Sequence, residues 1–438
     1  MLCYFSFVGT FSPSDLGSVF QRHRRSGHSE RKAVPDENEY EYENEFMSSA
    51  TIDAARPLSS GEFILADPAH FEIVESRQRQ VAEFLKSRQC EALLLQRPAN
   101  FSWFTVGGSN QRFNSADVTA ALFLTPDSRV VVTCNVDSGQ IFDREISGLG
   151  FQIKERPWHQ PRNVLIEDLC RGRKVISDCG FPGTKDDPAT IDSLRPPLQP
   201  LECQRLSELG KIVAHAVEAT ARHVVLGQSE SEIAGEVAHR LIKHEVTPIR
   251  IQVMADGRSQ QYRHWGFNGT LLKKWCAISA VGRRQGLHMT ATRTVCFGHP
   301  SERVADAHRQ AALVQATGMF FSQPRMDLSG LSDRIQRIYE KFIHVEEWQR
   351  ADQAEVTGYQ ACESPVVPRS QFRLATGMAI CWHCSVGPTV LGDTLLITKR
   401  HAELLTFAEQ WPMVRVDVKG RTISVPDILC REAGSLRD

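Results

Sequence analysis

Hydrophobic and polar residues alternate along the chain with two periods, one helical and one extended. Leu206, Leu209 and Val213 recur every three to four residues, which predicts an amphipathic helix that begins near Leu206. In residues 288–298, HMTATRTVCFG, threonine occupies every second position of the central TATRT. This two-residue period predicts a half-buried strand. The chain therefore contains both kinds of regular structure.

Residues 71–200 show the order helix, strand, hairpin, helix, strand. The stretch SRQRQVAEFLKSRQC has the helical period, and EALLLQ after it is a short buried strand. AALFLTPDSRVVVTCN contains two apolar runs around a turn-forming Pro-Asp-Ser cluster, which predicts a hairpin. This order predicts a small α/β domain, and no catalytic constellation of residues occurs in it.

Residues 201–410 contain a pair of helices followed by strand-like segments, and this order occurs twice. In the first pair Gly227 ends one helix, while Ser229 and Glu232 form the capping box of the next. A similar pair follows further along, in ADAHRQAALVQATGMFFSQP, which Pro324 ends, and in DLSGLSDRIQRIYEKF. The predicted fold class is α+β with an internal pseudo-twofold repeat, preceded by the smaller α/β domain.

Composition limits the class of protein. The chain has 438 residues, enough for two domains and a tail. A net charge of -1 predicts no basic face, so nucleic acid is not expected as a partner. No apolar run is long enough to span a membrane, so no membrane partner is expected. The 12 cysteines are scattered rather than regularly spaced, which favours a reduced, cytoplasmic protein.

Both ends of the chain are set apart from these domains. Residues 1–60 begin with the apolar run LCYFSFVGTF, which no basic residue precedes, and continue with a basic and an acidic block. The run is a poor signal peptide, and the charge blocks predict a solvated, disordered tail. Met47 is an alternative start of the protein. Residues 411–438 are assigned to a C-terminal extension.

Five segments carry a resemblance to a known family: LGQSESEI, TATRTVCFG, TGYQACESP, ATGMAICW and GDTLLITKRHAELLT. In this order they make residues 201–410 similar to the pita-bread domain of peptidase family M24, which includes creatinase, prolidase, aminopeptidase P and methionine aminopeptidase. Residues 71–200 resemble the N-terminal domain of creatinases and aminopeptidases P. The resemblance implies a homodimer, with this N-terminal domain near the partner's cavity, and a small peptide or amide as ligand.

The resemblance also implies where metal ligands would stand. Metalloenzymes of the family bind two divalent ions with two Asp, one His and two Glu, and a bridging water becomes the nucleophile. In this chain the five positions hold Ser279 (Val281 with a shorter loop), Thr290, Glu355, His383 and Gly392. Neutral hydroxyls and a glycine cannot neutralise two dications, so no dinuclear metal site and no cofactor are expected. Glu355 and His383 alone could hold one ion loosely.

The catalytic histidines of the family have one counterpart here. His264, in YRHWGF, matches the first of them, and the second falls at Cys362, which Glu363 follows. One interpretation makes His264 a general acid/base, as in the metal-free creatinase; the other is a histidine hydrogen-bonded in a loop between strands. Glu355 and Glu363 are the only acids expected near it. The resemblance assigns Glu355, Cys362 and His383 to substrate binding in the cavity.

The sequence CWHC at residues 381–384 has three interpretations. Its cysteines could form a zinc site with His383 and Cys362, or a redox pair. Turn and strand follow CWHC, however, and residues three apart on a strand point to opposite faces. Cys381 and Cys384 are therefore predicted to pack as small apolar residues in a buried sheet. Arg293 of the TATRT strand is predicted to be a structural ion-pair partner.

Two functions follow from these residues. The first is a catalytically degenerate pita-bread protein that keeps the fold to bind a peptide, a small amide or a partner. The second is a metal-independent, creatinase-like hydrolase of C–N bonds with His264 as general acid/base. The scarcity of replacement acids favours the first.

Overall fold

The computed structural model describes residues 67–112, 115–342, 346–407 and 410–432. All of them belong to one compact unit of the chain, residues 62–438. The disordered tail predicted for residues 1–60 and the alternative start at Met47 lie outside the described residues.

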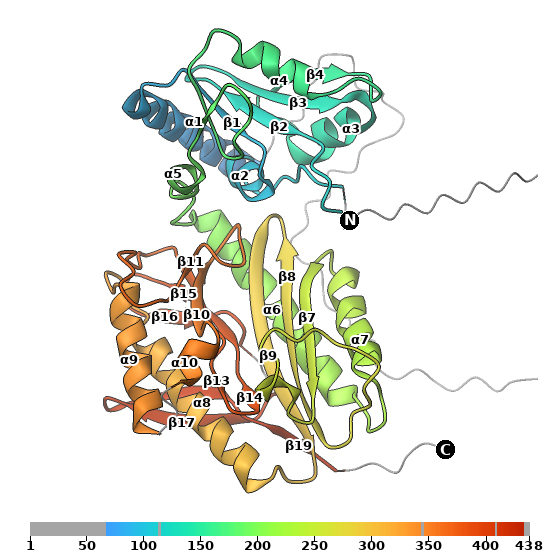
Figure 1. Cartoon of the computed structure of the whole chain (residues 1–438), viewed down its shortest axis with the longest axis vertical. Helices are drawn as coiled ribbons and strands as arrows, with labels where there is room; N and C mark the ends of the chain where they lie inside the picture. Colours follow the sequence, from blue (N-terminus) through green and yellow to red (C-terminus); the bar gives the residue numbers. More distant parts are fainter. Residues whose placement is uncertain (1–66, 113–114, 343–345, 408–409, 433–438) are drawn as a thin grey trace, which may run out of the picture. The chain divides into compact units, whose positions relative to one another are not determined.

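A mixed six-stranded sheet forms the centre of the N-terminal domain. Its strands are β1 (Ala92–Leu95), β2 (Ala121–Leu124), β3 (Arg129–Cys134), β4 (Gln152–Arg156), β5 (Val175–Ser177) and β6 (Lys185–Asp186). They lie in the order β4-β3-β2-β1-β5-β6 (Figure 1). β2 and β3 pair antiparallel, which confirms the predicted hairpin, whereas β5 runs parallel to β1.

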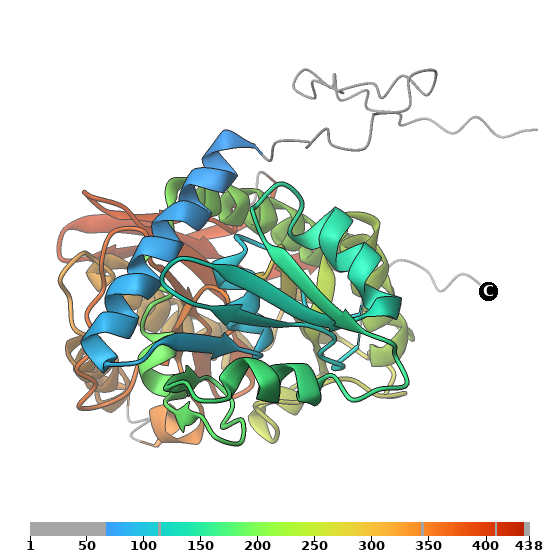
Figure 2. The same cartoon turned by 90° about the horizontal axis from the view of Figure 1, so that it is seen from above.

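Helices cover both faces of this sheet. They are α1 (Pro68–Arg88), α2 (Pro98–Phe104), α3 (Asn135–Gln140), α4 (Asn163–Cys170) and α5 (Pro188–Asp192), with a π-helical turn at Ile141–Glu145. Leu93 packs in one core cluster with Leu85 of α1. Figure 2 shows the helix α1 in blue beside the strands. Leu94 points the other way and packs in a second cluster with Ile166 of α4. Burial on both faces explains why EALLLQ is an unbroken apolar run.

The first half of the C-terminal domain is a four-stranded sheet backed by two helices (Figure 1). It consists of α6 (Pro200–His223), α7 (Glu230–Lys243), β7 (Thr247–Ala255), β8 (Trp275–Arg284), β9 (Leu287–Phe297) and β19 (Leu429–Arg431), with the short helix Arg258–Gln260 after β7. β7, β8 and β9 form an antiparallel meander, and β9 confirms the strand predicted for residues 288–298. The predicted half-burial is wrong, because every residue of β9 is buried. Ser229 and Glu232 form the predicted capping box at the start of α7.

The second half repeats this plan around a five-stranded sheet of order β11-β10-β12-β15-β16. Its elements are α8 (Glu302–Phe321), α9 (Leu328–Lys341), α10 (Glu347–Arg350), β10 (Ala354–Thr357), β11 (Ser364–Pro365), β12 (Ala379–Trp382), β15 (Asp393–Ile397) and β16 (Ala402–Leu404). A two-stranded ribbon, β13 (Ser385–Val386) and β14 (Thr389–Val390), lies between β12 and β15 in the sequence. Ala311 of α8, Leu331 of α9 and Ile380 of β12 share one core cluster.

The two halves meet where β9 contacts β15. The backbone N–H of Thr292 donates to the carbonyl of Gly392 at 2.9 Å, and the Thr394 hydroxyl donates to the carbonyl of Thr290 at 2.9 Å. These bonds bring together two of the five positions at which the resemblance expects metal ligands, Thr290 on β9 and Gly392 just before β15.

The segment assigned to a C-terminal extension takes part in this domain. The hairpin of β17 (Met413–Val418) and β18 (Arg421–Pro426) packs on α8, and β19 extends the first sheet parallel to β9. The predicted domain boundaries remain predictions. Among the described residues, no helix is both long and apolar enough to cross a bilayer.

Candidate functional site

Strand pairing brings Glu355 and His383 to one face of the second sheet. Glu355 on β10 lies opposite Cys381 on β12, and His383 follows two residues later, so all three side chains share a face. The backbone N–H of His383 also donates to the carbonyl of Gln353 at 3.0 Å, which extends the pairing beyond the end of β12. The sheet, rather than a mobile loop, therefore sets the distance between these two side chains.

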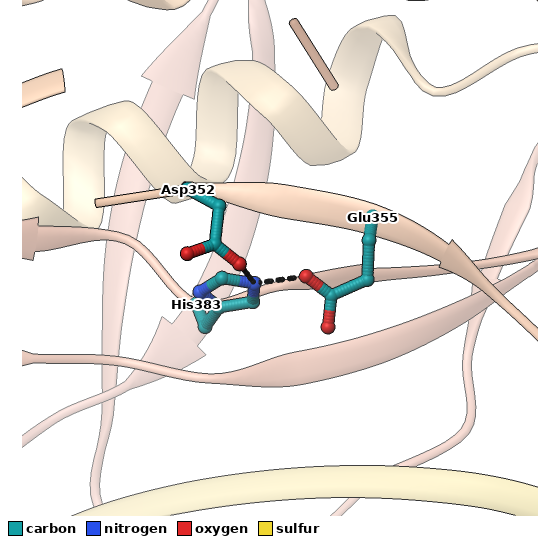
Figure 3. A group of neighbouring side chains, drawn as sticks. All are labelled: Asp352, Glu355 and His383. Carbon is teal, nitrogen blue, oxygen red and sulfur yellow. Dashed lines mark hydrogen bonds and ion pairs between the residues drawn. The ribbon is translucent and has the colours of Figure 1, made fainter. Parts of the chain in front are cut away.

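Asp352 completes a cluster with these residues (Figure 3). His383 Nε2 lies 2.5 Å from Glu355 Oε2 and 3.6 Å from Asp352 Oδ2. The other carboxylate oxygen of Asp352, Oδ1, lies 3.6 Å from Nε2 of His264. Three predicted site residues, His264, Glu355 and His383, thus converge through an aspartate that the sequence analysis did not single out.

The cluster runs from the protein interior to the surface. The exposed fraction of the side chain rises from 5% for Glu355 to 15% for His383, 41% for Asp352 and 64% for His264. His264 occupies the loop between β7 and β8, as one of the two interpretations expected. A small molecule that reached His264 from solvent would therefore meet the buried pair next.

The charges of the carboxylates change the acid–base behaviour of their neighbours. Burial lowers the pKa of His383, but the charge and hydrogen bond of Glu355 and the charge of Asp352 outweigh it, so the pKa lies above its ordinary value. Loss of water, with the charges of Glu355, Asp352 and Glu363, raises the pKa of the Cys362 thiol to about 12. Cys362 therefore stays a neutral thiol at physiological pH.

The two acids expected near His264 have different partners. Glu355 contacts His383, whereas both oxygens of Glu363 accept hydrogen bonds from Nε of Arg195, at 3.1 and 3.0 Å. That ion pair is buried, so the charge of Glu363 is balanced by Arg195. The second acid of the cluster is Asp352 instead. The sequence contains only one hint of it, an acidic side chain three positions before Glu355.

Hydroxyl groups and close packing surround Ser279 on β8, Thr290 on β9 and Gly392 just before β15, where the resemblance expects acidic ligands. Ser279 Oγ accepts a hydrogen bond from the Thr292 hydroxyl at 2.8 Å. Thr290 is tied to Thr394 through its backbone. A Cβ atom added at Gly392 would lie 2.4 Å from Thr292 Oγ1. Within the described residues, Asp352, Glu355 and His383 are the only group of three or more His, Cys, Asp or Glu ligand atoms close enough to hold a metal ion.

The cysteines of CWHC are buried, as the packing interpretation predicts. Cys381 and Cys384 are both free and have no exposed surface. Burial raises the pKa of each thiol well above its ordinary value, so neither forms a thiolate easily. Cys384 Sγ lies against the carbonyl of Gln353, whereas the hydroxyls of Thr290 and Thr394 act on Cys381. The two thiols thus have different neighbours, which opposes a shared zinc or redox role.

Arg293 is an ion-pair partner in the interior, as predicted. Its guanidinium donates to Glu218 Oε1 at 2.8 Å, to Asp393 Oδ1 at 2.9 Å and to the carbonyl of Thr406 at 2.7 Å. Gln315 and the Thr406 hydroxyl donate to the same Asp393 carboxylate. This Arg293 cluster satisfies its own charges next to the junction of β9 and β15.

A basic cavity lies close in sequence to the candidate site. It has a volume of about 650 Å³, and Arg258, Lys273, Arg303 and Arg350 line it together with Asp256. Arg350 precedes Asp352 by two residues, and Gln261, also in the lining, precedes His264 by three. Two of the four cations have acid partners, Arg258 with Glu230 at 3.2 Å and Arg350 with Glu347 at 3.5 Å.

Comparisons with known proteins agree with this architecture. Residues 204–399 match the model of "Metallopeptidase family M24", and no curated protein matches the chain. The prolidase from Pyrococcus horikoshii OT3 is similar with a TM-score of 0.67 and 17% identity, over 76% of this chain and 99% of that chain. For the Xaa-Pro dipeptidase from Bacillus anthracis the TM-score is 0.66 and the identity 15%, over 83% and 100%.

A third solved structure has a different description. The N-terminal domain of FACT complex subunit SPT16 from Cicer arietinum (chickpea) is similar with a TM-score of 0.61 and 11% identity, over 78% of this chain and 97% of that chain. At such identities these likenesses show the fold alone. They confirm the predicted α+β pita-bread domain and the α/β domain that precedes it.

Proposed function

Residues 204–399 belong to metallopeptidase family M24, and from this membership we propose that the protein uses the family's fold without its two-metal chemistry. In this proposal the region of His264, Glu355, Cys362 and His383 binds a short peptide or a small amide. It does not cleave the ligand with a metal-bridged water.

One observation carries this proposal. The three positions at which the resemblance expects acidic ligands, on β8, on β9 and just before β15, hold Ser279, Thr290 and Gly392, and hydrogen bonds and close packing surround them. A second ion would have no carboxylate to bind at these positions.

The ligand class follows from the groups near the site. The basic cavity favours a carboxylate, such as the C-terminus of a short peptide, because Lys273 and Arg303 in its lining add positive charge to the two paired arginines. Asp352 and His264 are exposed and are close in sequence to residues that line the cavity. They offer polar partners to an amide or an N-terminal amine.

The test combines a binding and a cleavage measurement on the full chain. An Xaa-Pro dipeptide is titrated into the protein by calorimetry, and release of its N-terminal residue is measured with Mn²⁺, Co²⁺ or Zn²⁺ added. We expect heat of binding that His264→Asn weakens, and no product. The matched control is His299→Asn, which changes an exposed histidine outside the cluster. Metal-dependent release of the N-terminal residue, with two tightly bound metal equivalents, would overturn the proposal.

A second candidate function is a metal-independent amide hydrolase. The contact that favours it is the one between His264 Nε2 and Asp352 Oδ1 at 3.6 Å, because a carboxylate can orient a histidine that acts as general base. Small amides and dipeptides are incubated with the protein in the presence of a chelator. Turnover that survives the chelator and disappears in His264→Asn supports this candidate, whereas turnover that His264→Asn retains excludes it.

Assembly and location are proposals of the same kind. We propose a homodimer in which the N-terminal domain lies near the partner's cavity, and a cytoplasmic location, both from the family resemblance and the reduced cysteines. Light scattering at micromolar concentration tests the first, and a strict monomer contradicts it. Fractionation of cells tests the second.

A further inference from the structure

We propose that Asp352, Glu355 and His383 bind one divalent metal ion, in a site that differs from the family's two-metal centre. This inference rests on the proposed function, because it names a cofactor for the same binding region. Two of its ligands stand at family positions with the residue types exchanged, a carboxylate at 355 and an imidazole at 383. The third, Asp352, matches none of the family's ligand positions.

The distances between donor atoms suit a single ion. Ligand atoms about 2.1 Å from one metal lie about 3.0 Å apart at octahedral angles and about 3.4 Å apart at tetrahedral angles. Here His383 Nε2 lies 2.5 Å from Glu355 Oε2 and 3.6 Å from Asp352 Oδ2, and all three donor atoms lie within 4.8 Å of one another. Small side-chain rotations therefore bring the three atoms to bonding distance of one point.

The backbone holds two of the ligands in place before any ion binds. Glu355 and His383 lie on the paired strands β10 and β12 or directly beside them, with His383 anchored by its N–H to the Gln353 carbonyl. A site on adjacent strands loses little conformational entropy on binding a metal. Asp352 lies just before β10, and its exposure provides a path for the ion from solvent.

Charge favours a cation at this position. Two carboxylates face one imidazole, and the remaining charges that act on the group are those of Arg250 on β7 and, beyond Asp352, of His264 if protonated. A metal ion binds the lone pair of His383 Nε2, and any proton on that nitrogen passes to solvent. The uptake of one ion should thus release up to one proton.

The ligand set indicates the class of metal. Two carboxylates and one imidazole suit borderline divalent ions such as Zn²⁺, Fe²⁺ and Mn²⁺ better than Ca²⁺, which prefers six or more oxygens. Three protein ligands leave at least one position open for water or for a ligand group. An amide carbonyl or a peptide amine that enters past His264 could occupy it, so the ion would join the binding region to its ligand.

The test titrates metal ions, with no other ligand, into the full chain. A chelator and dialysis first remove any bound metal from the protein. Zn²⁺ is titrated by calorimetry in two buffers of different ionisation enthalpy, with Mn²⁺ and Ca²⁺ as comparison ions. We expect one equivalent of Zn²⁺, tighter binding of Zn²⁺ than of Ca²⁺, and proton release visible as a difference between the buffers. Asp352→Asn and His383→Gln should each weaken binding at least about tenfold.

The control Glu340→Gln removes an exposed carboxylate on α9 and should leave the affinity for Zn²⁺ unchanged. Circular dichroism of each variant verifies that it is folded; Asp352→Asn changes a partly exposed residue and provides the decisive result if His383→Gln unfolds. Binding weaker than about 0.1 mM, the weak end of specific cation sites, overturns the inference and leaves the proposed function intact. Affinity that Asp352→Asn leaves unchanged also overturns it. Two equivalents with peptide release overturn both.

Discussion

Two clusters in the C-terminal domain each contain two carboxylates and one nitrogen-containing side chain. In the Arg293 cluster this side chain is a guanidinium that is 1% exposed and lies between Glu218 and Asp393. In the cluster of His383 the base is an imidazole between Glu355 and Asp352, and Asp352 reaches the surface. Each cluster has two carboxylates, but the guanidinium is a permanent cation, whereas the imidazole can gain or lose its proton.

The difference shows how one fold separates a structural ion group from a candidate functional one. Arginine is always charged and presents several donors, so its cluster is complete without any outside group. Histidine can lose its proton, and its neutral ring binds metals. Three residues that offer one ligand atom each, with a path to solvent, have chemistry that the Arg293 cluster lacks.

The largest expected effect comes from removal of the permanent cation. Arg293→Met should reduce the free energy of unfolding by about 3–5 kcal/mol, because it removes the buried cation that lies between the carboxylates of Glu218 and Asp393. Arg309→Met, which removes an exposed pair with Asp306, is the control and should cost less than about 1 kcal/mol. Urea denaturation of both variants measures the difference. Equal losses would show that the Arg293 cluster contributes little to stability.

A third base sharpens the comparison, because His288 on the same strand as Arg293 has no acid partner. Burial, with the charge of Arg283, lowers the pKa of His288 to about 4. A lowered pKa means that the folded state disfavours the proton, so stability is complete above the unfolded pKa and falls with pH towards the folded value. Between pH 7 and 4.5 this histidine should cost about 2–3 kcal/mol of unfolding free energy.

The variant His288→Gln isolates that contribution, because glutamine does not titrate. Unfolding free energies of the protein and the variant are measured in urea at both pH values. The protein should lose more stability on acidification than the variant does. Parallel losses would mean that His288 is protonated in the folded state without cost.

A side chain added at the closely packed Gly392 should have a smaller effect on stability. Gly392→Ala should destabilise the fold by about 1–3 kcal/mol, since the new Cβ would lie 2.4 Å from Thr292 Oγ1. Gly235→Ala in α7, where nothing lies within 4 Å of the added atom, should instead stabilise by about 0.5–1 kcal/mol. Thermal unfolding of both variants measures these changes in stability. A neutral Gly392→Ala would mean that the position can accept a side chain, and would weaken the argument against a ligand there.

The smallest effect on stability is expected at the exposed end of the His383 cluster. His264→Asn should change the unfolding free energy by less than about 0.5 kcal/mol, because the side chain is 64% exposed and belongs to no core cluster. Its effect should be on ligand binding instead. A loss of stability as large as that of Arg293→Met would assign His264 a structural role and remove the contrast between the clusters.

Local sequence signals were sufficient for much of the fold. The capping box of Ser229 and Glu232, the turn of the hairpin β2–β3 and the period of β9 all depend on neighbours within a few positions, and each prediction is confirmed. Local signals were not sufficient for the C-terminal segment. β19 is only Leu429–Arg431, too short for a periodic signal, and it becomes a strand because it pairs with β9.

The candidate site divides in the same way. The sequence by itself determined that residues 279, 290 and 392 are not acids, whereas their assignment to the family's ligand positions follows from motif order and stays a prediction. Only the tertiary structure decided that Asp352 joins His264 to His383 while Glu363 pairs with Arg195. Those partners lie 31 to 168 positions apart, and the distances between their atoms result from strand pairing and loop paths that no local pattern encodes.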